Sequence, residues 1–165
     1  MPIRMTRLHF AATGSTALLA ASLVLPGNGL DVVRAHEVKF SAGVPGNTKK
    51  PSRTIEIAMR EEYGLQIFEP NRIEVKRGEQ IRFVLRNEGK HDHEFMLATT
   101  KENLAHAKVM AKHPDMEHSD PNGITLKPGD AGEILWRFTR RGTFEYACLF
   151  PGHREDGMFG AVVVK

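Results

Sequence analysis

Short runs of alternating apolar and polar residues recur along the chain from residue 54 onward. In the first run, Ile55, Ile57 and Met59 share one face, while Glu56 and Ala58 lie on the other. A period of two is typical of a β-strand with one buried face. Similar alternation covers residues 72–76, 81–86, 93–97, 124–126, 134–138 and 144–148, and residues 160–164 are apolar throughout.

These runs are separated by turn sequences such as Lys76-Arg-Gly-Glu79, with no regular alternation of strands and helices. Seven or so short strands in this arrangement predict an all-β fold, a Greek-key β-sandwich, over residues 54–165. One insertion has helical character. We also expect the runs 72–76 and 81–86 to form a hairpin, because only a short turn joins them.

The last two predicted strands enclose a loop with three residues that bind metals, Cys148, His153 and Met158. Cys148 is the only cysteine of the chain, and each of the other two follows at an interval of five residues. Thiolate, imidazole and thioether are ligands that select copper, and two histidines, one cysteine and a weak axial methionine describe a blue-copper site. The loop lacks one histidine of that set.

His93 is the best candidate for the second imidazole. It shares the parity of Phe95 and Leu97, so it enters its strand in register with core residues. Cys148 likewise continues the parity of the buried-face residues in the run before it. Both side chains are therefore expected to point inward. Zinc also accepts cysteine and histidine, but methionine as the fourth ligand favours copper.

The N-terminus has the features of a secretory signal peptide over residues 1–35. Arg4 and Arg7 precede an uncharged stretch rich in alanine and leucine, and small residues flank Arg34 before the expected cut after Ala35. A membrane-anchoring helix is the alternative, but the run at 10–25 is shorter than the roughly 20 residues needed to span a bilayer. We expect a periplasmic protein with no stable membrane span after cleavage, and a flexible leader over residues 36–53.

Removal of residues 1–35 changes the charge balance. That segment holds three of the 23 basic and one of the 20 acidic side chains, so the mature chain carries a net charge of about +1. No basic stripe with interleaved aromatic residues remains, and nucleic acid is not an expected partner. A single cysteine in an exported protein cannot form an internal disulfide, and its thiol is liable to oxidation unless a metal occupies it.

Residues 99–113 contain good helix formers and apolar residues at helical spacing, and Pro114 follows them. The structural interpretation is a solvated helix and loop that cover one end of the sandwich. The alternative is a secondary copper site, because this insertion is rich in histidine and methionine. Its candidate ligands are His106, Met110, His113, Met116 and His118.

These features resemble the cupredoxins, the small type-1 copper proteins. The resemblance lies in the Asn87-x-Gly turn before His93, the turn at 127–130 and the run from Gly142 to Gly160. It covers residues 54–165. The four-residue gap between Cys148 and His153 is similar to that of azurin and rusticyanin. The sequences around His93, around Cys148 and at 112–118 resemble periplasmic cupredoxins associated with copper tolerance, including some with green type-1 sites.

The resemblance implies one copper ion per chain, bound by His93, Cys148, His153 and axial Met158. It also implies that His153 is the ligand nearest the surface, where an electron would enter or leave. Three apolar residues around it are a candidate docking patch for redox protein partners, although they could instead close the end of the sandwich: Phe150, Pro151 and Phe159. One departure is Glu94, at a position where cupredoxins often have asparagine linking the two ligand loops.

The sequence thus favours an exported type-1 copper protein, blue or green, that transfers one electron by cycling between Cu(I) and Cu(II). The alternative is a periplasmic copper tolerance or sequestration protein that uses the same site together with the insertion. We do not expect an enzyme such as a multicopper oxidase, because one cysteine supplies one type-1 site and the mature chain has no length for a second domain.

Overall fold

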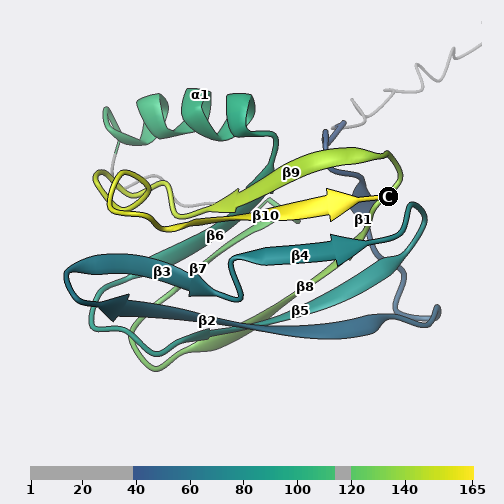
Figure 1. Ribbon diagram of the computed structural model, residues 1–165, viewed down its shortest axis with the longest axis horizontal. Coiled ribbons are helices and arrows are strands. Elements are labelled where there is room, and N and C mark those ends of the chain that lie inside the picture. Colours follow the sequence, from purple (N-terminus) through teal and green to yellow (C-terminus); the bar gives the residue numbers. More distant parts are fainter. Residues whose placement is uncertain (1–38, 114–119) are drawn as a thin grey trace, which may run out of the picture. The chain divides into compact units, whose positions relative to one another are not determined.

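The computed structural model describes residues 39–113 and 120–165. The predicted signal peptide and the first residues of the leader lie outside this part. The described chain folds into two five-stranded sheets with one helix, α1, beside them (Figure 1). The predicted β-sandwich is confirmed.

The first sheet has the strand order β1-β8-β5-β2-β3. β2 and β5 run parallel, and β8 pairs with β5 in the antiparallel sense. Its members are β1 (Val44–Pro45), β2 (Arg53–Glu62), β3 (Leu65–Glu69), β5 (Gln80–Asn87) and β8 (Ala131–Arg137).

The second sheet has the order β4-β10-β9-β6-β7 and carries the residues of the predicted metal site. β9 lies between β10 and β6, and both pairings are antiparallel. Its members are β4 (Arg72–Val75), β6 (His93–Ala98), β7 (Gly123–Leu126), β9 (Gly142–Ala147) and β10 (Phe159–Val164).

The core lies between the two sheets and is rich in aromatic rings. Phe95 stacks on Tyr146 with ring centroids 5.2 Å apart, and Phe68 meets both rings edge to face. Cys148 and Met158 belong to the same buried cluster. These two predicted site residues are therefore packed into the hydrophobic core, which fixes the backbone around them.

The helix α1 (Thr100–Met110) lies against the outer face of the second sheet (Figure 1). Its first turn has a capping box in which Thr99 and Glu102 bind each other's backbone amides. Met110 packs with Met96, Ala147 and Leu149 in a second apolar cluster. As a result, all six residues of β6 are buried, on both faces of the sheet.

Three details differ from the expectations. The predicted hairpin of 72–76 and 81–86 is wrong, because β4 pairs with β10 in one sheet and β5 pairs with β2 and β8 in the other. The connecting turn instead carries the chain between the layers.

Within the predicted leader, β1 pairs with β8, and Phe40 packs edge to face on Trp136. The strand β3 is absent from the predicted set, since its alternation is weak.

Candidate metal centre

His93 and Cys148 reach the same end of the second sheet by strand pairing. His93 is the first residue of β6, and Cys148 directly follows the last residue of β9. Because these strands are antiparallel neighbours, the start of one lies beside the end of the other. The loop that continues from Cys148 to β10 then brings His153 back over the same place.

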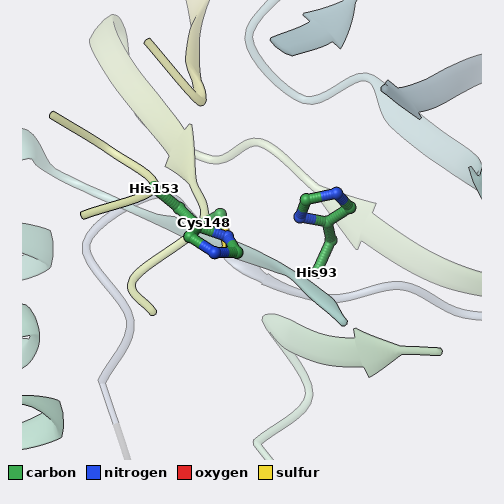
Figure 2. A group of neighbouring side chains, drawn as sticks. All are labelled: His93, Cys148 and His153. Carbon is green, nitrogen blue, oxygen red and sulfur yellow. The ribbon is translucent and has the colours of Figure 1, made fainter. Parts of the chain in front are cut away.

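One ligand atom from each of His93, Cys148 and His153 lies within 4.8 Å of the other two. Cys148 Sγ is 3.3 Å from His153 Nδ1, and the centroids of the two imidazole rings are 5.2 Å apart. Figure 2 shows the three side chains, with His93 coming from a different segment than the other two. Among residues 39–113 and 120–165, this is the group of histidine, cysteine and carboxylate side chains close enough to share one ion.

The imidazole of His93 is wholly buried, and its two nitrogens have different surroundings. Nε2 lies 3.1 Å from Oε1 of Glu61, whereas the buried Nδ1 has no hydrogen-bond partner. A buried polar atom without a partner is costly and calls for an explanation such as an unseen ion. A metal bound at Nδ1 would supply that partner and would require the proton to stay on Nε2, from which Glu61 accepts a hydrogen bond.

Both imidazoles are biased towards the neutral, metal-binding form. Burial lowers the pKa of His93, although Glu61 acts in the opposite direction. Burial also lowers the pKa of His153, and the positive charge that His93 would carry if protonated lowers it further. Two neutral rings beside one thiol make a donor set that copper and zinc both accept.

The thiol of Cys148 is fully buried and accepts a hydrogen bond from the Glu94 amide, with a nitrogen to Sγ distance of 3.3 Å. Burial raises the pKa of the thiol to about 12, although backbone hydrogen bonds from Glu94 and Phe150 act in the opposite direction. A coordinating metal ion deprotonates a thiol outright. The pocket is therefore suited to a thiolate when a cation is present.

The loop from Cys148 to Met158 is closed by its own backbone. The Cys148 amide donates to the Met158 carbonyl at 3.1 Å, and the Met158 amide donates to the His153 carbonyl at 2.9 Å. Gly157 has a φ of +106°, a backbone conformation that residues other than glycine rarely adopt. Met158 is fully buried beside this junction. Its role as the axial ligand stays a prediction.

An ion pair between buried Glu145 and half-buried Arg154 connects the same loop to the sheet and the helix. Arg154 donates two hydrogen bonds to the carboxylate of Glu145 in β9, at 3.2 and 2.9 Å. Glu145 also accepts bonds from Thr100 and Asn103 of α1, each at 3.1 Å. One carboxylate thus connects the residue after His153 with the helix.

Glu94 occupies the place of the usual asparagine and is completely buried. Its Oε2 accepts a hydrogen bond of 3.3 Å from the Leu149 amide, so a link between the two ligand segments is present. Burial raises the pKa of Glu94 to about 7, against the effect of the Leu149 amide.

The three residues of the predicted docking patch surround His153 unevenly. Phe159 is 45% exposed, Pro151 is exposed and Phe150 is half-buried. The Phe150 ring centroid lies 5.7 Å from that of His153, and Arg154 lies over the Phe159 ring. Their role as a patch stays a prediction.

The predicted secondary site is only partly described. Met110 is buried against the second sheet, His106 is half-buried beside a cavity of about 230 Å³, and His113 is exposed. Met116 and His118 lie outside the described residues. Metal binding by this set stays a prediction.

Two residues of the site were not singled out from the sequence, Glu61 and Glu145. Glu61 continues the parity of Ile57 and Met59, so it is a charged residue in a core-facing register. That mismatch is a signal that sequence reasoning could have used. Glu145 lies on the face opposite Phe144 and Tyr146, and only the position of α1 explains its burial.

Comparison with known proteins assigns the chain to a family. Residues 55–165 match the copper-binding proteins of the plastocyanin/azurin family. The chain therefore belongs to the cupredoxins, and copper is its cofactor. A protein of Rubrivivax gelatinosus named copper-resistant cuproprotein CopI is 46% identical over 131 residues, which are 79% of this chain and 78% of the relative.

A protein of the same name from Pseudomonas aeruginosa is 34% identical over 181 aligned positions, covering 90% of this chain and 97% of that protein. Among solved structures, reduced auracyanin from the photosynthetic bacterium Roseiflexus castenholzii superposes with a TM-score of 0.58. It is 22% identical, and the match covers 70% of this chain and 99% of auracyanin. This likeness supports the fold.

Proposed function

We propose that this protein provides copper resistance in the periplasm by binding copper at a type-1 site made by His93, Cys148, His153 and axial Met158. The observation that carries the proposal is the cluster of the buried Cys148 thiol with the imidazoles of His93 and half-buried His153, in which Nδ1 of His93 lacks a partner. The relatives named copper-resistant cuproproteins support resistance as the role.

Copper supplies a centre that exchanges one electron between its two common oxidation states. The thiolate and thioether favour Cu(I), while the imidazoles also suit Cu(II). The protein contributes a fixed set of ligands, because His93 lies in a paired strand and the loop from Cys148 to Met158 is closed by backbone hydrogen bonds. Ligands that stay in place keep the cost of changing oxidation state small.

Electron transfer to another protein is the second candidate function. Its support is the half-buried His153 beside exposed Pro151 and the 45% exposed ring of Phe159. Redox partners commonly meet through small interfaces. We propose no enzymatic activity, since one cysteine supplies one type-1 centre.

The proposed exported location rests on the sequence of residues 1–35. In the part of the chain that the structure describes, no helix has the length and apolar character required to cross a membrane.

Copper titration followed by visible spectroscopy tests the site. We expect the purified protein to develop an intense thiolate-to-copper band that reaches its maximum at one copper per chain. The Cys148→Ser variant should lack the band. A wild-type protein without the band, or a band that persists in Cys148→Ser, would contradict the type-1 assignment.

Deletion of the gene separates the two roles. Copper resistance predicts poorer growth of the deletion strain on copper, restored by the wild-type gene and not by Cys148→Ser. Unchanged growth on copper together with a defect in respiratory or photosynthetic electron transfer would instead favour the electron carrier. Copper binding of more than one equivalent would support the secondary site in the insertion.

A further inference from the structure

Glu61 makes an unusual number of hydrogen bonds with the segment that carries His93. Its carboxylate accepts bonds from the Lys90 amide at 3.0 and 2.8 Å and from the His91 amide at 3.2 Å. It also lies 3.1 Å from Nδ1 of His91 and 3.1 Å from Nε2 of His93. A single side chain therefore holds both the turn before β6 and the ring of the first ligand.

The local backbone is shaped to allow this contact. A Cβ atom added to Gly89 would lie 2.6 Å from Oε1 of Glu61 and 2.9 Å from Nε2 of His93. Both distances are shorter than real Cβ contacts. The absence of a side chain at position 89 is thus what lets the carboxylate reach the imidazole.

The surroundings of the Glu61 side chain suit a carboxylate anion. It accepts hydrogen bonds from the backbone amides of Lys90 and His91 and lies beside the imidazoles of His91 and His93. A carboxylate behind a metal-binding imidazole fixes which ring nitrogen keeps the proton, orients the ring and makes it a stronger donor.

We propose that Glu61 is a positioning residue for copper, which fixes His93 with Nδ1 towards the metal and stabilises Cu(II) relative to Cu(I) by its negative charge. This inference rests on the proposed type-1 site. Cu(II) carries one more positive charge than Cu(I), so a nearby anion favours the oxidised ion and lowers the reduction potential.

The test compares Glu61→Gln with the wild-type protein and with Glu62→Gln, a matched control at the neighbouring exposed position of β2. The side-chain amide introduced by Glu61→Gln can still accept a hydrogen bond but carries no charge. We expect Glu61→Gln to weaken Cu(II) binding about tenfold relative to Cu(I). For a one-electron couple, that change raises the reduction potential by about 59 mV. Glu62→Gln should leave the potential unchanged.

A measurement without metal tests the contact independently. Nitrogen NMR of the ring of His93 in the copper-free protein should show the tautomer with the proton on Nε2. Glu61→Ala, which removes both charge and acceptor, should abolish this preference. A merely structural role would alter unfolding of the variants but would leave the potential of Glu61→Gln equal to that of Glu62→Gln.

The outcomes separate this inference from the proposed function. A wild-type protein without the thiolate-to-copper band overturns the type-1 site itself. A normal band in the wild type, with equal potentials for Glu61→Gln and Glu62→Gln, overturns the role of Glu61 alone. Retention of the Nε2 proton preference in Glu61→Ala overturns it as well.

Discussion

The two histidines of the proposed metal centre are held in different ways. His93 is part of a paired strand, wholly buried, and contacts the carboxylate of Glu61 directly. His153 lies in a loop, half-buried, and is held through its neighbour Arg154, which binds Glu145. The difference indicates a division of roles, in which one ligand is fixed by the core and the other lies where the site meets its surroundings.

Ligand deletion followed by rescue should reveal this difference most strongly. Both His93→Gly and His153→Gly should lose the thiolate-to-copper band, because each removes an imidazole. Added imidazole should restore the band in His153→Gly, where the gap reaches the surface, but not in His93→Gly, where it is enclosed. Visible spectra at increasing imidazole concentration measure the effect, and equal recovery of both variants would contradict the comparison.

Loss of the ion pair behind His153 should destabilise the protein noticeably. Arg154→Ala leaves the buried carboxylate of Glu145 without its charged partner, at an expected cost of about 2 kcal/mol in the free energy of unfolding. Urea unfolding of the copper-free protein measures it. The control Arg82→Ala removes an exposed pair with Glu133 and should cost less than about 1 kcal/mol. Equal costs would show that Arg154 is not an anchor.

A methyl group at position 89 should disturb His93, with a smaller loss of stability than Arg154→Ala causes. Gly89→Ala pushes the Glu61 carboxylate away from His93, and the expected cost is about 1 kcal/mol, because the flexible side chain can shift. The reduction potential should rise, as in Glu61→Gln. Lys90→Ala, an exposed neighbour whose amide still reaches Glu61, serves as the control. A Gly89→Ala protein with the wild-type potential would disprove the proposed contact.

The smallest effect is expected at the start of α1, the helix that supports Glu145. Burial raises the pKa of Glu102, but hydrogen bonds from Ser41 and Thr99 lower it by more. The pKa of Glu102 in the folded protein is therefore lowered. A lowered pKa in the folded state contributes stability above the ordinary pKa of 4.5, which is lost as the pH falls below it. Glu102→Gln should remove this acid sensitivity and cost about 0.5 kcal/mol at neutral pH. Urea unfolding at pH 4 and 7 measures the acid sensitivity and the cost of the substitution. If Glu102→Gln left the pH dependence of stability unchanged, Glu102 would not be its source.

The sequence is most informative about the proposed metal centre where the information is local. Spacing places Cys148, His153 and Met158 in one loop, and strand parity turns His93 inward. The contacts of Glu61 could not be predicted in the same way, because they join the two sheets and depend on how the layers stack. The wrong hairpin has the same origin: β4 and β5 are adjacent in sequence, but they pair with the distant strands β10 and β2 in different sheets.

The contact of Glu61 with His93 joins β2 of one sheet to β6 of the other. A hydrogen bond of 3.1 Å across the layers is lost if one sheet slides by an ångström or two. The first ligand can therefore take its final orientation only after both sheets have docked. Competence to bind copper with the native geometry should arise at the last stage of folding, so metal uptake would report on completed assembly of the sandwich.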